Sequence, residues 1–180
     1  MFYCFLAEGF EELEAIGAVD MLIRAGIEVK LVGVTGETVT GAHNIRIVTD
    51  CSCDDVILDS GLEGIMLPGG MPGTLNLEKS DDVQKIINFA ASEGKIVSAI
   101  CAAPMILGHK GLLENREAIA YPGFEKELHG ATVSEKHVVR DCNFITAKGA
   151  GVAADFGLEI VAALKGEELS DQIRRAIQSK

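Results

Sequence analysis

The chain has 180 residues and a formal net charge of −11, and 48% of its residues are hydrophobic. This composition can build one core without disulfides or metal, so we expect a single domain over residues 1–180. The negative charge disfavours nucleic acid and anionic lipid as partners, and no apolar run reaches the roughly 18 residues that a membrane span needs. The apolar start lacks a basic leader region, which predicts a cytoplasmic protein.

Cysteines and histidines show no metal or disulfide spacing. The five cysteines are odd in number and scattered, with no C-x-x-C pair: Cys4, Cys51, Cys53, Cys101 and Cys142. The four histidines do not follow the H-x₃₋₅-H spacing of zinc sites: His43, His109, His129 and His137. We therefore expect no structural metal.

Short β-rich runs alternate with helical patterns along the chain, which predicts βαβ units and a mostly parallel sheet. The first third predicts a strand over 2–7, a helix over 11–25 and a strand over 27–34. The helix should turn an apolar side that includes Leu13, Ile16 and Ile23 toward the core. Glycines within 35–50 indicate a small hairpin on the sheet edge.

The middle and last thirds continue the same alternation. The predicted strands lie at 64–67, 95–100, 138–139 and 144–146. The predicted helices run from Ser80 or Asp81 to Ser92, over 102–108, over 152–164 and over 167–178.

Cys101 stands where a predicted strand passes directly into a predicted helix. The apolar run 96–100 precedes it, and Ala102, Ala103 and Pro104 follow. Small residues suit such a nucleophile elbow because the backbone is crowded there. A helix N-terminus favours thiolate over thiol, and the Ala102 N–H can form one arm of an oxyanion hole. We expect a nucleophilic cysteine; the alternative is a small, inert, buried side chain.

Two further segments lie near the carboxyl ends of predicted strands. Gly69 and Gly70 follow the strand 64–67 and allow a ligand to approach the backbone closely, although an ordinary turn explains them as well. Glu14 lies one turn into the first helix between apolar neighbours. If it points toward the sheet it is partly buried, and a protonated Glu14 could then donate a hydrogen bond to a thiolate.

Taken together, these segments resemble the ThiJ/PfpI superfamily, in the branch that contains the Parkinson-associated protein deglycase and thiazole-biosynthesis-labelled bacterial homologues. The resemblance covers nearly the whole chain and rests on FLAEGFEELEA at 5–15, LPGG at 67–70, AICAAP at 99–104, TAKGAG at 146–151 and DFGL at 155–158. It implies a three-layer α/β sandwich of flavodoxin-like (class I glutamine amidotransferase-like) type. It also implies a homodimer with Leu13 near the contact.

The resemblance assigns roles to individual residues. Cys101 matches the nucleophile and Glu14 the carboxyl that hydrogen-bonds it, while Gly70 and Ala102 match the backbone N–H donors near the sulfur. We expect Gly69 and Tyr121 beside them in the substrate site. Many enzymatic relatives carry a histidine before a proline, where this chain has Tyr121. A tyrosine is a poor general base near neutral pH.

Three functions remain open from the sequence. The first is a cofactor-free enzyme on small reactive carbonyls, which converts 2-oxoaldehydes to 2-hydroxy acids or removes early glycation adducts through Cys101 and Glu14. The second is a redox sensor or stress-response protein that acts through oxidation of Cys101 without turnover. The third is an amidase or peptidase, which is disfavoured because Ala102 stands where those relatives carry histidine.

Overall fold

The computed structural model describes residues 1–179 and is built around one seven-stranded sheet. The strand order is β10-β11-β7-β6-β1-β2-β5, and β10 is antiparallel to β11 while the other pairs are parallel. Its strands are β1 (Phe2–Leu6), β2 (Val29–Gly33), β5 (Cys51–Ser52), β6 (Gly64–Leu67), β7 (Ile96–Ile100), β10 (Val138–Asp141) and β11 (Phe144–Ala147). Two small pairs stand apart from it: β3 (Thr38–Thr40) with β4 (Arg46–Val48), and β8 (Glu117–Ala118) with β9 (Thr132–Val133).

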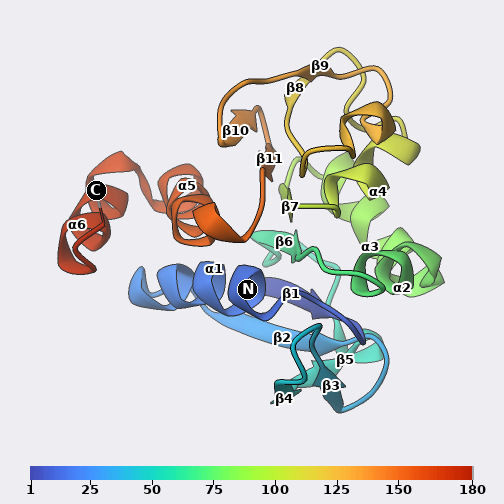
Figure 1. The fold of residues 1–180 in the computed structure, drawn as a ribbon. Coiled ribbons are helices and arrows are strands. Elements are labelled where there is room, and N and C mark those ends of the chain that lie inside the picture. Colours follow the sequence, from blue (N-terminus) through green and yellow to red (C-terminus); the bar gives the residue numbers. More distant parts are fainter. Residues whose placement is uncertain (180) are drawn as a thin grey trace.

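Helices cover both faces of this sheet, which makes three layers (Figure 1). One face carries α1 (Glu12–Arg24) and α5 (Ala153–Lys165), with α6 (Glu167–Ala176) packed against α5. The other face carries α2 (Gly73–Lys79), α3 (Asp81–Ser92) and α4 (Pro104–His109). Three short 3₁₀ turns complete the elements: η1 (Cys53–Asp55), η2 (Glu125–Glu127) and η3 (Ala150–Val152).

The first strand, β1, is apolar throughout because both of its faces are buried. Phe2 and Leu6 pack into the core on the α1–α5 side, whereas Tyr3 and Phe5 pack into the core beneath α3 and α4. Successive side chains of a strand point to opposite faces, and both faces are covered here. A central parallel strand therefore has no solvent-facing position for a polar residue.

Most predicted elements are confirmed, and the α/β class with a mostly parallel sheet is confirmed with them. The Ser80 hydroxyl accepts a hydrogen bond from the Val83 N–H at 3.4 Å, as expected of an N-cap. The predicted edge hairpin forms, but its edge position is wrong, since β3 and β4 make a separate pair and the unpredicted β5 is the edge strand. The helix α2 was also not predicted, because its segment reads as a glycine-rich loop.

The expected apolar side of α1 is confirmed in part, since Ala18, Val19 and Leu22 are buried as predicted. It is wrong for Leu13 and Ile23, which are each 58% exposed, and for Ile16, which is 38% exposed. The helix α1 packs closely on α5: a Cβ on Gly157 would lie 2.7 Å from the Ala18 carbonyl oxygen. The three exposed side chains form an apolar strip on the outer side of α1.

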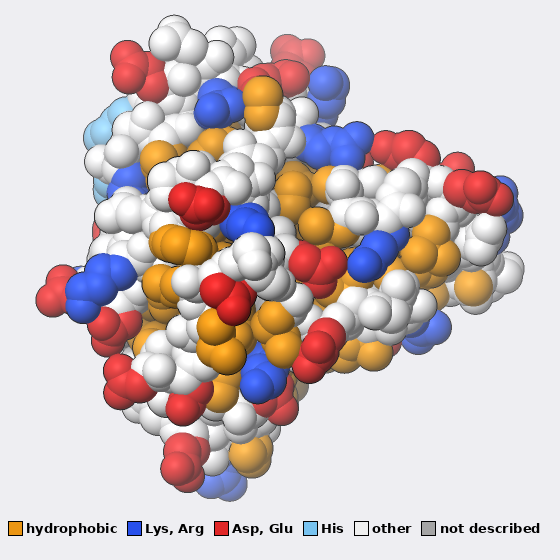
Figure 2. All heavy atoms as spheres, turned by 180° about the vertical axis from the view of Figure 1, so that it is seen from behind, with side chains coloured by type: hydrophobic (Ala, Val, Ile, Leu, Met, Phe, Trp, Pro, Cys, Tyr) orange, Lys and Arg blue, Asp and Glu red, His pale blue; other side chains and the backbone are white. Residues whose placement is uncertain are grey.

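Acidic side chains are spread over the face of the molecule shown in Figure 2, and basic side chains lie between them without forming a continuous patch. This distribution agrees with the negative net charge. Within residues 1–179, no helix has the length and apolar character needed to cross a membrane.

Candidate active site

The predicted site residues meet where the parallel strands end. Cys101 directly follows β7, and Gly69 and Gly70 follow β6, the neighbouring strand. Glu14 comes from the first turns of α1, and Gly149 follows β11 on the other side of β7. The carboxyl edge of a parallel sheet is where ligands bind in open α/β folds. The structure thus brings together side chains that lie far apart in the sequence.

Cys101 has the backbone geometry of a strand-to-helix elbow. Its φ is 64°, in the left-handed region that side-chain-bearing residues rarely adopt. Two hydrogen bonds hold this conformation, because the Cys101 N–H donates to the Ala147 carbonyl at 2.9 Å and the Cys101 carbonyl accepts from the Tyr121 N–H at 2.8 Å. Such strain persists where the surrounding structure fixes it, and functional sites are where it collects.

Glu14 reaches under the elbow from α1. Its side chain is 1% exposed, and its Oε2 accepts a hydrogen bond from the Gly69 N–H at 2.9 Å. The carboxyl group also hydrogen-bonds the Cys101 side chain. A Cβ at position 69 would lie 2.6 Å from the Cys101 Cβ and 2.7 Å from Glu14 Oε2, so only glycine fits between them. The three residues form one close-packed unit.

The environment of Glu14 makes its carboxyl a group that can hold a proton near neutral pH. Burial raises its pKa to about 7, because the charged form loses its hydration. Hydrogen bonds to Cys101 and to the Gly69 N–H favour the charged form and oppose this, while the negative charge of Glu11 adds to the rise. A carboxyl with this pKa can accept and return a proton at physiological pH.

The expectation that the helix N-terminus lowers the pKa of Cys101 is wrong. Burial, followed by the charge of Glu14 and the hydrogen bond to it, raises the pKa of the thiol to about 12. The helix acts weakly because α4 begins only at Pro104 and is six residues long. Cys101 and Glu14 therefore titrate as a pair that keeps one proton near neutral pH, and the thiolate forms when that proton moves to Glu14.

Two backbone N–H groups are aimed at the sulfur, as the sequence predicted. The Ala102 and Gly70 N–H groups hydrogen-bond the Cys101 side chain and act to lower its pKa, although burial outweighs them. Gly70 has a φ of 89°, and a Cβ there would lie 2.4 Å from the Glu11 backbone nitrogen. A larger residue at this position would displace the donor. The pair of donors can stabilise negative charge on the sulfur or on an oxygen next to it.

A cavity of about 470 Å³ opens beside the elbow. Tyr121, Lys148 and Gly149 line it, and a Cβ on Gly149 would lie 3.2 Å from Tyr121 Cδ2 and 4.0 Å from Cys101 Sγ. Tyr121 is 49% exposed and therefore forms an outer wall. His137 also lines this cavity, and no residue pattern in the sequence placed it or Lys148 at the site. The TAKGAG segment at 146–151 was the available signal for Lys148.

The histidines do not supply a base to Cys101. Within residues 1–179, no histidine is among the groups that act on the pKa of Cys101 or of Glu14. His109 and His129 lie together at the far end of α4, with ring centroids 5.1 Å apart. Their separation in the sequence gave no signal of this contact. The structure brings only His137 to the cavity wall.

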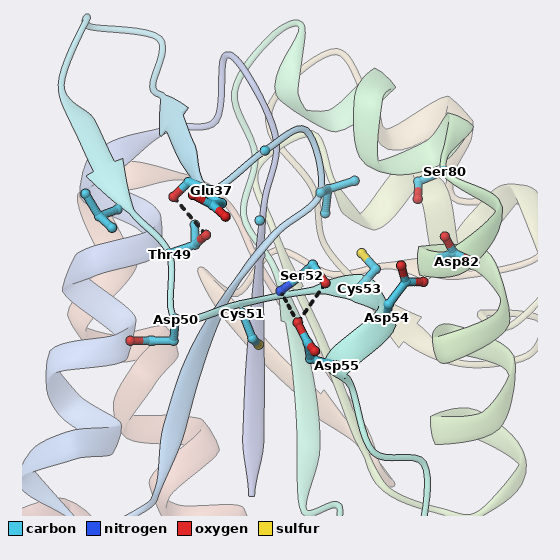
Figure 3. A pocket seen from close by; sticks show the side chains of 14 residues that line it. Glu37, Thr49, Asp50, Cys51, Ser52, Cys53, Asp54, Asp55, Ser80 and Asp82 are labelled. Carbon is cyan, nitrogen blue, oxygen red and sulfur yellow. Dashed lines mark hydrogen bonds between the residues drawn. The ribbon is translucent and has the colours of Figure 1, made fainter.

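A second cavity, of about 580 Å³, lies beside β5 and η1 and contains two other cysteines (Figure 3). The side chains of Cys51 and Cys53 point away from each other there. Burial is the main cause that raises the pKa of both thiols, to about 11 for Cys53, and nearby aspartates raise both further. This cavity is larger than the one at Cys101, but it offers no thiol with a buried proton acceptor.

Comparison with known proteins agrees with this geometry. The model of the DJ-1/PfpI family matches residues 2–163. Protein dj-1beta of Drosophila melanogaster is 35% identical over 175 residues, which cover 96% of this chain and 93% of that protein. The glutathione-independent glyoxalase DJR-1.2 of Caenorhabditis elegans is 32% identical over 171 residues, which cover 94% of this chain and 91% of that protein.

Solved structures show the same fold. Oxidized Toxoplasma gondii DJ-1 superposes with a TM-score of 0.94 at 28% identity and covers 99% of this chain and 97% of its own. Drosophila melanogaster DJ-1beta superposes with a TM-score of 0.92 at 32% identity, with the same coverage of 99% and 97%. These matches confirm the resemblance and the three-layer fold. The chain belongs to the DJ-1/PfpI family.

Proposed function

We propose that this protein is a cysteine-dependent enzyme that converts small 2-oxoaldehydes to 2-hydroxy acids without a cofactor. The observation that carries the proposal is the contact between Cys101 and a buried Glu14 whose pKa is raised to about 7. This pair supplies a nucleophile together with a proton acceptor whose pKa lies near neutral pH. The name of the Caenorhabditis elegans relative, a glutathione-independent glyoxalase, supports the same reaction class.

The reaction begins when Cys101 Sγ adds to the aldehyde carbon while its proton passes to Glu14. The resulting hemithioacetal oxygen takes up that proton, and the Gly70 and Ala102 N–H groups stabilise the oxygen while it is negative. Glu14 then removes the C1 hydrogen as a proton to give an enediolate, and the C1 hydroxyl proton passes to the C2 oxygen. Glu14 returns its proton to C2, which leaves a thioester of the 2-hydroxy acid. Water hydrolyses the thioester and restores the thiol. C1 is oxidised and C2 reduced, so no external oxidant or reductant is needed.

A related substrate class is the early glycation adduct on an amine or thiol. Such an adduct is formed from the same 2-oxoaldehydes, and the same sulfur would attack its former aldehyde carbon. Tyr121, which lines the cavity beside the Cys101 elbow, is half exposed, so an adduct that is attached to a larger molecule can approach from this side. Release of the free amine or thiol, measured beside hydroxy-acid formation, separates this activity from action on the free aldehyde.

The test is lactate formation from methylglyoxal by purified wild type and Cys101→Ala. The matched control is Cys142→Ala, which removes an exposed cysteine outside the site. We expect turnover in the wild type and the control and none in Cys101→Ala. Undiminished turnover in Cys101→Ala would refute the proposal, and the absence of lactate from all three proteins would also count against it.

The alternative function is a redox sensor at the same cysteine. The observation that favours it is the pair of backbone N–H donors at the Cys101 sulfur, from Gly70 and Ala102, which can also hydrogen-bond an oxidised sulfur. One structural relative, Toxoplasma gondii DJ-1, is described as oxidized. Selective conversion of Cys101 to sulfenic or sulfinic acid by mild peroxide would support a sensor. Equal oxidation of all five cysteines would contradict it.

We further propose that the protein acts as a homodimer that buries the apolar strip of α1. Leu13 and Ile16 on α1 and Ile45 beside β4 are exposed large hydrophobic side chains, and relatives of this family imply a dimer near Leu13. Burial of such side chains on association is favourable. Light scattering should show a dimer for the wild type and for the control Val133→Glu, and a monomer for Leu13→Glu. A dimeric Leu13→Glu would exclude this face.

A further inference from the structure

A cluster of possible metal ligands lies at the end of α4 that is farthest from Cys101. His109, Glu127 and His129 each place one ligand atom so that all three atoms lie within 4.8 Å of one another. His109 ends α4, Glu127 belongs to η2, and His129 follows two residues later. The two histidines are 20 positions apart in the sequence. Only the packing of η2 against α4 brings them together.

That packing is close and holds the ligands on fixed backbone. A Cβ on Gly108 would lie 2.1 Å from the Glu127 carbonyl oxygen, so the backbones of α4 and η2 touch at the residue before His109. Leu128, between Glu127 and His129, is 3% exposed and belongs to the hydrophobic core. The two candidate ligands on this loop therefore flank a buried anchor. A site of this kind loses little conformational freedom when it binds an ion.

The distances fit a metal of zinc-like size. His109 Nε2 lies 3.1 Å from Glu127 Oε2. Two ligand atoms that are bound tetrahedrally at about 2.0–2.1 Å from zinc are about 3.3 Å apart, so this pair needs almost no movement. His129 is exposed and can turn its ring toward the same point. A water molecule would complete four ligands.

The other nitrogen of His109 is already oriented. His109 Nδ1 lies 2.6 Å from Glu78 Oε1 on α2. With Nδ1–H donating to Glu78, loss of the proton that Nε2 shares with Glu127 would leave the Nε2 lone pair directed at Glu127 and His129. Histidines that bind metals commonly donate their second N–H to a carboxylate in this way, which fixes the tautomer and the ring plane. Glu78 is therefore a positioning residue for His109.

We propose that His109, Glu127 and His129 bind a divalent transition metal such as Zn²⁺, with Glu78 orienting His109. Two imidazoles and one carboxylate select borderline metals over Mg²⁺ and Ca²⁺, which prefer oxygen ligands alone. Bound metal would join the end of α4, the helix that follows Cys101, to the segment that begins with Tyr121 at the cavity wall. Its role would be to stabilise that wall rather than to take part in the chemistry.

One other cluster of possible ligands within residues 1–179 is weaker. Glu11, Glu12 and His43 offer only one imidazole. Glu12 Oε1 already accepts hydrogen bonds from the His43 and Ile45 N–H groups, so metal binding there would compete with existing contacts. His43 therefore provides the matched histidine control.

The test is a calorimetric titration of the full chain with Zn²⁺, comparing wild type with His109→Gln, His129→Gln and the control His43→Gln. We expect one site per chain in the wild type and in His43→Gln, and its loss in the other two variants. Glu78→Gln should weaken the affinity roughly 10-fold while keeping one site. Zn²⁺ should also raise the Tm of the wild type in a concentration-dependent way.

Two controls keep the outcome decisive. Melting without metal shows that each variant is folded, which is expected because both histidines are exposed. Binding that survives in His109→Gln and His129→Gln but is lost in Cys101→Ala would place the metal on the thiol and overturn the proposal. Co²⁺ gives a separate signal, since thiolate binding adds a sulfur charge-transfer band in the near ultraviolet that a nitrogen and oxygen site lacks. No binding by the wild type would also overturn it.

Discussion

Cys101 and Cys53 show how differently two cysteines of one chain can be placed. Each is partly buried, lies beside a cavity and has acidic neighbours that raise the pKa of its thiol in addition to burial. At Cys101 the acidic neighbour is the buried Glu14, whose own pKa is raised to about 7. In the cavity that contains Cys53, Asp55 raises the pKa of the neighbouring Cys51, and it accepts hydrogen bonds from the Ser52 N–H and hydroxyl, which lower its own pKa (Figure 3).

A cysteine beside a carboxyl group is therefore not sufficient for nucleophilic catalysis. A carboxyl that stays ionised raises the pKa of a nearby thiol but cannot accept its proton at neutral pH. A carboxyl whose pKa lies near neutrality can accept the proton and return it. The deciding quantity is the burial of the carboxyl, not the number of acidic groups or the size of the cavity. Each of the following experiments challenges one part of this contrast.

The largest effect is expected for Glu14→Gln. Removing the proton acceptor from the Cys101 pair should lower kcat/KM for methylglyoxal by roughly 10²–10⁴-fold, the usual contribution of general acid–base catalysis. The matched control is Glu37→Gln, which removes an exposed carboxyl from the Cys53 cavity and should leave kcat/KM unchanged. Equal loss in both variants would remove the distinction between the two regions.

The stability of the protein should depend on pH through the titration of Glu14. The pKa of Glu14 is 4.5 in the unfolded chain and about 7 in the folded protein, because burial disfavours its charged form. Between these values the folded state binds the extra proton. The stabilisation is therefore complete below pH 4.5 and is lost as pH rises through about 7. At about 1.36 kcal/mol per pKa unit, the raised pKa of Glu14 corresponds to a stabilisation of the folded state on the order of 3 kcal/mol.

Urea denaturation of wild type and Glu14→Gln at several pH values measures this change. The difference in unfolding free energy between the two proteins should fall as the pH rises from 4.5 to about 7. The contributions of other titrating groups to this difference cancel, because both proteins contain them. A flat difference for Glu14→Gln would mean that folding does not raise the pKa of Glu14.

Gly69→Ala tests the close packing between Cys101 and Glu14. The added methyl would lie 2.6 Å from the Cys101 Cβ and 2.7 Å from Glu14 Oε2, so these side chains must separate. We expect a loss of about 1–3 kcal/mol in unfolding free energy, typical of overpacking, together with reduced turnover. Gly151→Ala is the control, because a Cβ there has open space. A neutral Gly69→Ala would show that the contact is loose.

The smallest effect is expected for Tyr121→Phe. The contact of Tyr121 with Cys101 uses the backbone N–H, which the substitution keeps, and the half-exposed ring remains in the cavity wall. Stability should change by no more than about 0.5 kcal/mol, as for most surface substitutions, and kcat should be nearly unchanged. Tyr121→Ala removes the ring and should raise KM. A large fall in kcat for Tyr121→Phe would assign its hydroxyl a direct role.

Local patterns in the sequence were sufficient to predict much of the fold. The apolar runs that became β6 and β7 are short and bounded by turn residues, and Ser80 is a direct N-cap signal for α3. The elbow at Cys101 was predicted because a strand, a cysteine and small residues are contiguous. Where the pattern was weak, prediction failed: α2 reads as loop, and β5 is only two residues long.

Local residue patterns predicted most strands and helices in their chain order and the position of Cys101, because these depend on neighbouring residues. The requirement for glycine at position 69, the pKa of Glu14, the exposure of Leu13 and the meeting of His109 with His129 depend on tertiary packing. Glu14 and Gly69 are 55 positions apart, yet their hydrogen bond lies in the protein interior. Burial and long-range contact depend on how helices pack on the sheet, and no local pattern of residues encodes that packing.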